Sequence, residues 1–230
     1  MDNIKTAEEL LNIAKAEAMG DCVFDHMLDF IEIGMTEKEI ADEIERKFLE
    51  LGASGLSFPT IAVSGANSAC PHGVPSDHII KPGEFLTLDM GCIYHGVCSD
   101  MTRTIAIGYA TEEMMHIYDV VLEAQLAGLD AVKAGAYCAD VDAVCRDIIT
   151  EAGYGEYFIH TTGHGVGNEV HEAPRLGKDS KDFLRENMAV TIEPGIYLPD
   201  RFGVRIEDTV IVTDCGHINL AHSPKELLVL

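Results

Sequence analysis

The hydrophobic pattern of the first fifty residues predicts two amphipathic helices. Thr6 and Glu9 form a capping box in front of apolar residues at helical spacing, which indicates one long helix that ends before Gly34. A second capping box begins at Thr36 and opens a shorter helix, which Gly52 closes. The chain therefore begins with a helix–helix unit.

Shorter apolar runs follow and predict strands. One run covers residues 57–64, and a turn-rich loop over residues 66–77 comes after it. Two longer runs, over residues 85–93 and 97–107, are separated by only a few residues and are typical of a hairpin. The first half of the chain thus has the order helix, helix, strands.

The same order recurs in the second half. Thr111 caps a helix that Gly135 ends, and a shorter helix continues to Gly153. The strands predicted after it lie around Phe158 and over residues 188–192 and 204–212. The spacing from Gly34 to Gly52 equals that from Gly135 to Gly153, although the two halves share little sequence identity. We therefore predict an α+β fold built from a duplicated helix–helix–strand unit with pseudo-twofold symmetry and a site between the halves.

Composition restricts the classes of partner. The formal net charge is −23, which argues against nucleic acid or an anionic membrane, because binding phosphate requires lysine and arginine. No apolar run approaches the length of a membrane span, and no linker divides the chain, so we expect one domain over residues 1–230. The seven cysteines are scattered and no signal peptide precedes them, which predicts reduced thiols in a cytoplasmic protein.

Four carboxylates interrupt the apolar, strand-like runs. They are Asp89, Asp100, Glu193 and Glu207. Taking an isolated ionised carboxylate into a dry interior costs on the order of several kcal/mol, so a chain tolerates it where the acid is paired or binds a cation. For any one of these acids, a solvated position at a strand end is as good an explanation as a paired or cation-binding position. For four acids in similar settings it is the weaker explanation.

Hairpin geometry predicts that these acids meet. A turn at Tyr94-His95 would place Asp89 and Asp100 directly opposite each other, with their Cβ atoms ~5 Å apart, and any even-length loop keeps them on one face. Glu193 and Glu207 could approach in the same way across the connection between them. Like charges this close require a counter-charge.

A pair of divalent cations would supply that counter-charge. Two metals ~3.5–4 Å apart form a common dinuclear arrangement, and four carboxylates balance two divalent ions. Oxygen-rich sites suit manganese, whereas an imidazole ligand also admits cobalt, zinc or iron. The sequence does not choose among these metals.

The imidazole has an obvious source between residues 157 and 174. His160, His164 and His171 lie there among glycines, in a stretch with neither helical nor strand periodicity. Histidine is a common metal ligand and a proton-transfer group at physiological pH. For this stretch alone, the alternative is a glycine-rich surface loop with incidental histidines.

These residues resemble the metal-ligand set of the pita-bread metallopeptidases, a family that includes methionine aminopeptidase, aminopeptidase P, prolidase and the non-peptidase creatinase. The likeness covers nearly the whole chain and is greatest to the aminopeptidase P and prolidase branch. The strings that carry it are Pro71-His72-Gly73, Ser99-Asp100-Met101-Thr102-Arg103-Thr104, Gly163-His164-Gly165-Val166-Gly167, Thr191-Ile192-Glu193-Pro194-Gly195-Ile196-Tyr197 and Gly203-Val204-Arg205-Ile206-Glu207-Asp208.

The resemblance implies a role for each of the five ligands. Asp100 and Glu207 would bridge two metals, Asp89 would bind one of them, and His164 and Glu193 would bind the other. A hydroxide between the metals would attack the scissile carbonyl. Glu193 would also move the proton.

The resemblance also assigns catalytic residues around the metals. His72 and His171 would contact the substrate and stabilise the tetrahedral intermediate, and His160 would be a further active-site histidine. Arg205 would orient the carboxylates, although a plain strand-face salt bridge is the alternative. Two other groups are predicted to lie outside the site: Tyr197 in the core, and His95, His116, His217 and His222 at the surface.

The implied activity is hydrolysis of the bond between an N-terminal residue and proline, in peptides or in dipeptides. Methionine aminopeptidase is the first alternative; the length of the chain favours it, but Pro71 stands where that enzyme usually has cysteine. The others are a non-catalytic peptide-binding member of the fold and a creatinase-like hydrolase. Prolidase and aminopeptidase P usually carry an N-terminal domain, so we expect a catalytic domain without it, and an oligomer is compatible with the sequence.

Overall fold

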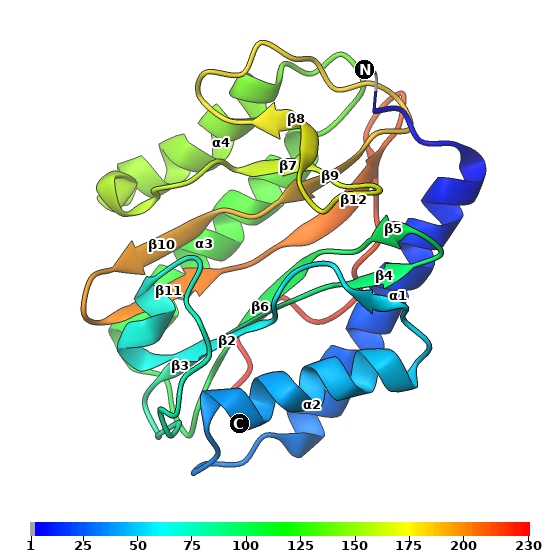
Figure 1. Ribbon diagram of the computed structural model, residues 1–230. Coiled ribbons are helices and arrows are strands. Elements are labelled where there is room, and N and C mark those ends of the chain that lie inside the picture. Colours follow the sequence, from blue (N-terminus) through cyan, green and yellow to red (C-terminus); the bar gives the residue numbers. More distant parts are fainter. Residues whose placement is uncertain (1–2) are drawn as a thin grey trace.

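The computed structural model describes residues 3–230 and contains two helix pairs with strands between them (Figure 1). The first pair is α1 (Ala7–Phe30) and α2 (Glu37–Glu50), and the second is α3 (Glu112–Ala131) and α4 (Cys138–Glu151). Both predicted capping boxes form at the starts of α1 and α2, and the Thr111 hydroxyl accepts the Met114 N–H at the start of α3.

The strands form one five-stranded sheet, two three-stranded sheets and one two-stranded ladder. The first half contains β1 (Gly55–Leu56), β2 (Ile61–Ser64), β3 (Phe85–Met90), β4 (Cys92–Tyr94), β5 (Val97–Cys98) and β6 (Met101–Ala106). The second half contains β7 (Gly163–Gly165), β8 (Glu172–Leu176), β9 (Ala189–Ile192), β10 (Gly195–Leu198), β11 (Phe202–Arg205), β12 (Asp208–Val212) and β13 (His217–Asn219). The strand orders are β2-β3-β6, β1-β4-β5, β13-β12-β9-β7-β8 and β10-β11.

The predicted duplication is confirmed by the second helix of each pair. The buried apolar residues Ile40, Ile44 and Phe48 of α2 recur at the corresponding positions of α4 as Val141, Cys145 and Ile149. Thr36, before α2, pairs with Ile79, and Tyr137, before α4, pairs with Phe183 in the same antiparallel way. Each helix pair thus packs on its own apolar core, although Phe85 and Ala106 from strands of the first half lie in the core of the second.

Two predicted strands are wrong in their bounds. The run over residues 57–64 forms a strand only from Ile61, because Pro59 has no N–H to donate to a ladder. Phe158 lies in no strand and follows a short 3-10 turn, Gly155–Tyr157. Its carbonyl accepts a hydrogen bond from Arg146, whose guanidinium covers the ring 4.1 Å from its centre.

The remaining long runs break at or beside the four acids. Asp100 lies between β5 and β6, Glu193 between β9 and β10, and Glu207 between β11 and β12. Before Glu193, Ile192 of β9 pairs with Asp208 of β12. After it, Gly195 of β10 pairs with Arg205 of β11. This register places Glu193 opposite Glu207 at the point where two ladders part, as the hairpin geometry predicts.

The register of the first hairpin corrects the sequence prediction. The turn is centred on His95 and Gly96, both with positive φ, and Tyr94 pairs with Val97. Asp89 therefore faces Thr102 and not Asp100. The shift amounts to two residues, so Asp89 and Asp100 keep the same side of the strand pair.

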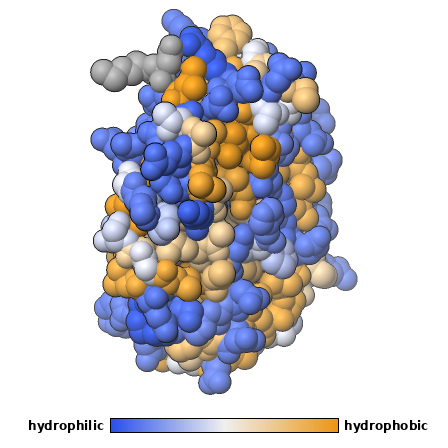
Figure 2. Space-filling view, turned by 90° about the vertical axis from the view of Figure 1, so that its right-hand side faces the viewer, coloured by the Kyte–Doolittle hydropathy of each residue, from blue (hydrophilic) through white to orange (hydrophobic). Residues whose placement is uncertain are grey.

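The surface is polar and acidic. Acidic side chains outnumber basic ones by 39 to 16. The face on the α1 side of the molecule, seen in Figure 2, is mostly hydrophilic, with an apolar patch above its middle and further apolar groups along its lower part. Across residues 3–230, no helix has both the length and the apolar character needed to span a bilayer.

A buried ion-pair network joins the two halves beneath the acids. The Arg103 guanidinium on β6 donates to the Glu207 carbonyl and to Asp208 Oδ1, at 2.6 and 2.7 Å. Asp208 Oδ2 accepts from Lys225, Gln125 and Asn219. Burial raises the pKa of Asp208, but the charges of Arg103 and Lys225 outweigh it and hold this pKa below its ordinary value.

Replacing Asp208 by asparagine should therefore destabilise the fold. The change leaves Arg103 buried without its counter-charge, which costs about 3–5 kcal/mol in comparable proteins. Urea denaturation of Asp208→Asn measures this loss, with Asp214→Asn as the matched control. Asp214 is exposed, and its substitution should change stability by less than ~0.5 kcal/mol. Equal stabilities of the two variants would contradict the prediction.

Candidate metal centre

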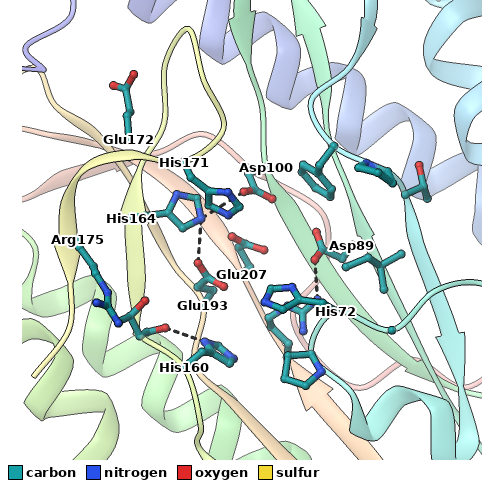
Figure 3. A pocket seen from close by; sticks show the side chains of 18 of the residues that line it. His72, Asp89, Asp100, His160, His164, His171, Glu172, Arg175, Glu193 and Glu207 are labelled. Atoms are coloured by element: carbon teal, nitrogen blue, oxygen red, sulfur yellow. Dashed lines mark hydrogen bonds and ion pairs between the residues drawn. The ribbon is translucent and has the colours of Figure 1, made fainter.

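One cavity of about 850 Å³ collects all the residues assigned to the site from the sequence (Figure 3). Its lining includes the five predicted ligands, Asp89, Asp100, His164, Glu193 and Glu207. It also includes the other predicted site residues, His72, His160, His171 and Arg205. Figure 3 shows the carboxylates in the middle of the group, with His164 and His171 on one side and His72 on the other.

His164 and two bridging candidates form a compact donor set. Ligand atoms of Asp100, His164 and Glu207 all lie within 4.8 Å of one another. His164 Nε2 is 3.6 Å from Asp100 Oδ2 and 3.2 Å from Glu193 Oε1. Strand β7 supplies His164, so one half of the molecule presents the imidazole to an acid of the other half.

Asp89 is held slightly apart by an arginine. Arg205 Nη2 donates to Asp89 Oδ2 at 2.6 Å, and its Nε donates to Thr102 Oγ1 at 3.1 Å. Thr102 in turn donates to Glu207 Oε2 at 2.6 Å. Arg205 is buried and bonded on each side, an arrangement suited to the orienting role inferred from the sequence.

The donor set fits a divalent cation. Asp89 Oδ1 and Glu207 Oε1 are buried and have no hydrogen-bond partner among the described residues. Buried polar atoms are ordinarily paired, so two unpaired carboxylate oxygens in one cavity call for a positive partner. Carboxylates with one imidazole are ligands that manganese, iron, cobalt and zinc accept.

The electrostatics of the acids lead to the same conclusion. Burial raises the pKa values of Asp100 and Glu207 well above their ordinary range, and repulsion from neighbouring acids adds to the effect. Burial also raises the pKa of Asp89, although the Arg205 charge opposes it. Burial acts on Glu193 too, but the hydrogen bond and charge of His164 outweigh it and lower the Glu193 pKa to about 2. Arg205 and His164 thus compensate only part of the negative charge.

The histidines form the walls of the cavity. The His171 ring packs edge-on against His164, with centroids 4.3 Å apart. His160 Nε2 lies 2.8 Å from the Tyr197 hydroxyl. His72 is exposed and projects from the loop that follows β2. The structure therefore brings together every histidine assigned to the site from the sequence.

Tyr197 was expected in the core alone, and that expectation is incomplete. Its ring is buried, but its hydroxyl accepts a hydrogen bond from Arg205 Nη1 at 2.8 Å and meets His160. Two glycines make room for it: a Cβ at Gly195 would lie 2.6 Å from the hydroxyl, and one at Gly203 would lie 2.7 Å from the ring. Alternation along β10 gives Tyr197 the same face as Glu193, a signal the sequence carried.

Sequence reasoning also missed three side chains that act on the site. Thr191 Oγ1 donates to Glu193 Oε1 at 3.0 Å, and Thr102 holds Glu207. Arg175 on β8 is exposed, lines the cavity and forms no ion pair with any other described residue. It pairs with His164 across the sheet, but that register shifts at a bulge that the sequence does not reveal.

Comparison with known proteins agrees with this geometry. The model of the metallopeptidase family M24 matches residues 12–214. The chain belongs to this family. Its M24 relatives include an Xaa-Pro dipeptidase of Pyrococcus furiosus, 44% identical over 225 residues, which are 98% of this chain and 65% of that protein.

Solved M24 structures give the same result for the fold. An Xaa-Pro dipeptidase from Bacillus anthracis superimposes with a TM-score of 0.98 at 50% identity, over 99% of this chain and 64% of the other. An X-Pro aminopeptidase from Thermotoga maritima gives 0.97 at 39% identity, over 99% and 65%. The predicted family and pita-bread fold are confirmed, and the chain spans about two thirds of the length of these relatives.

A further acid, Glu17 on α1, binds the backbone of Asp100. Glu17 is fully buried, and its Oε1 accepts the Asp100 N–H at 2.8 Å, which Asp100 offers because it lies outside the strands. Its other oxygen has no partner among residues 3–230. Burial raises the Glu17 pKa to about 8.

This shift makes the free energy of unfolding of the metal-free, chelator-treated protein depend on pH. Between the ordinary value of 4.5 and about 8, the folded carboxyl keeps its proton while the unfolded one loses it. Unfolding then releases a proton, so stability falls as pH rises through this window. Glu17→Gln removes this titration and still accepts the Asp100 N–H. Urea denaturation across pH measures the free energy of unfolding. The value for the variant should rise relative to that for the parent between pH 4.5 and 8, and the difference should be constant above pH 8. A pH-independent difference would contradict the assignment.

Proposed function

We propose that this chain is the catalytic unit of a dinuclear metal-dependent exopeptidase that hydrolyses the bond between an N-terminal residue and proline. The observation that supports it most is the convergence of four acids and His164 in one open, peptide-sized cavity. A structural ion-pair cluster would have no reason to lie at the floor of a cavity, with exposed histidines around it.

Asp89, Asp100, His164, Glu193 and Glu207 would hold the metals, with Asp100 and Glu207 shared between them. Two divalent ions bound there would activate the attacking water and polarise the scissile carbonyl. The oxygen-rich donor set favours manganese, and cobalt, zinc and iron are the alternatives. Each fits the charge of the cluster.

The chain's own residues would move the proton and bind the peptide. Glu193 stays ionised at neutral pH because the hydrogen bond and charge of His164 hold its pKa low against the effect of burial, so it can accept the proton of the attacking water. Thr191 fixes the orientation of the carboxylate. His171 and His72 lie on opposite walls and can donate hydrogen bonds to the oxygen that gains charge. Glu193 would then return the proton to the leaving proline nitrogen.

The cavity walls support a proline-containing substrate. Apolar residues of the first half, among them Phe58, Ile61 and Val74, line one side of the cavity. Arg175 offers a cation that can pair with a carboxylate. In a dipeptide the C-terminal carboxylate follows the proline directly, so Arg175 favours dipeptides.

A longer substrate is the second candidate. The cavity is open, and a relative with the same fold is an X-Pro aminopeptidase. The choice between the two rests on peptide length.

Seven free cysteines, three of them exposed, support the reducing environment of the cytoplasm as the place of action.

The decisive experiment is a mass-spectrometric cleavage panel on manganese-loaded protein, with a chelated control. The panel contains an Xaa-Pro dipeptide, a longer Xaa-Pro-Xaa peptide and a Met-Ala peptide. We expect chelator-sensitive cleavage before proline, with the dipeptide preferred if Arg175 binds its carboxylate. Cleavage of Met-Ala alone would replace the proposal by methionine aminopeptidase. Two bound metals without any cleavage would favour a peptide-binding role.

The bridging assignment has its own test. Asp100→Ala should lose both metals, because a residue shared by two ions supports each of them. Elemental analysis of metal per chain after desalting gives the answer. Asp182→Asn is the matched control, since Asp182 lines the same cavity but lies outside the proposed ligand set. A variant at Asp100 that still holds two metals would show that Asp100 does not bridge.

A further inference from the structure

The wall of the cavity that carries His72 is a loop with little regular structure of its own. After the short 3-10 turn Gly65–Ala69, the chain runs to Phe85 without a strand. Near His72 the loop has two tight-turn bonds of its own, from Cys70 N–H to the Asn67 carbonyl and from Gly73 N–H to the Cys70 carbonyl, and one bond from Asn67 Nδ2 to the Val74 carbonyl at 3.1 Å. These bonds do not tie the two ends of the loop to each other, so a contact from outside the loop is needed there.

Glu37, the first residue of α2, lies at the centre of this loop. Its Oε1 accepts the Ser64 N–H and hydroxyl, at 2.6 and 3.1 Å. Its Oε2 accepts from Asn67 Nδ2 at 2.8 Å and from the Ser76 N–H and hydroxyl at 2.9 and 2.7 Å. One carboxylate thus binds both ends of the segment over residues 64–76, at Ser64 and Ser76, and Asn67 near its start.

The surroundings of Glu37 suit a carboxylate in particular. It is fully buried, which costs free energy, but the N-terminus of a helix stabilises an anion and five donors surround the two oxygens. Both of its oxygens face backbone or amide N–H groups, which can only donate. A glutamine in either orientation would turn its own NH₂ group against one of these donors.

The second half contains a matching arrangement. Asp142, a buried acid on α4, accepts the Thr162 N–H and hydroxyl at 3.1 and 3.0 Å. Its partner Arg146 donates to the carbonyls of Phe158 and His160 at 2.9 and 2.8 Å. The equivalent helix of each half therefore uses a buried acid to hold the loop that presents an active-site histidine.

We propose that Glu37 is a positioning residue, which fixes the segment over residues 64–76 so that His72 faces the cavity. Its effect on turnover rests on the proposed peptidase function, whereas its effect on the loop does not. Glu37 does not line the cavity, so it acts through the segment that it holds. That segment also supplies Val74 to the apolar wall, and we assign the effect on turnover to His72.

Hydrogen exchange tests the effect on the loop. In Glu37→Gln, the amides of Ser64 and Ser76 should exchange at least ~10-fold faster, since both bind the Glu37 carboxylate directly. Glu45→Gln is the matched control: Glu45 lies on the same helix, is only half-buried, and its carboxylate has no hydrogen bond to another described residue. Should Glu37→Gln fail to fold, Ser76→Ala gives a milder variant, which removes one of the five bonds to Glu37 together with the bond from the His78 N–H to the Ser76 hydroxyl. The amide at position 76 should then exchange faster. Unchanged exchange at both amides, or at position 76 in the milder variant, would overturn the proposal.

Kinetics test the link to His72. Glu37→Gln should keep its metals and lose between about 10- and 100-fold in kcat/KM, because small misplacements of a catalytic wall have effects of this size. In His72→Ala, the additional change Glu37→Gln should cost no more than ~2-fold, since the residue that it positions is absent. Independent, multiplying losses would show that Glu37 acts in another way and overturn the proposal. If the parent protein cleaves nothing, the peptidase function fails and the exchange measurement alone decides the role of Glu37.

Discussion

Repulsion among like charges held out of water is the constraint on which this structure depends. Asp89, Asp100, Glu193 and Glu207 share one cavity, and Arg205 and His164 offset only part of their charge. A fold tolerates such a cluster where a positive ion completes it. The acids are held in place by the hydroxyl groups of Thr102 and Thr191, by the Arg205 guanidinium and by the Arg103–Asp208 network. Chemistry and stability are therefore set by the same few contacts.

Much of the fold and nearly all of the candidate site could be predicted from the sequence. Capping boxes fixed the helix starts at Thr6 and Thr36, because those signals are local. The acids could be found because a carboxylate in an apolar run is costly wherever it lies. Local signals could not give the register of Asp89, since the turn at His95 and Gly96 requires positive φ at a residue that rarely adopts it. Local signals also could not show that Phe158 lies outside the strands, because its carbonyl accepts a hydrogen bond from Arg146 on α4. Nor could they show that the Tyr197 hydroxyl meets Arg205 and His160.

Duplication explains why the site has the composition that it has. Asp89 ends the run Leu86-Thr87-Leu88-Asp89 in the first half, and Glu193 ends Val190-Thr191-Ile192-Glu193 in the second. Asp100 comes directly before β6, which pairs with β3, the strand that carries Asp89. In the same way, Glu207 comes directly before β12, which pairs with β9, the strand that ends just before Glu193. Each half thus supplies two acids in equivalent places. The imidazole of His164 is the component that only the second half provides, and it makes the two ends of the site chemically different.

The breaks in the strands have a consequence for how such a site can vary. The Glu207 N–H bonds the Thr102 carbonyl, and the Thr209 hydroxyl bonds the Asp100 carbonyl, so the backbone at the acids joins one half to the other. The separation of the acids is then a property of how the halves pack, and neither half sets it alone. Substitutions far from the cavity, in the contact between the halves, can adjust this spacing in small steps while every ligand is retained.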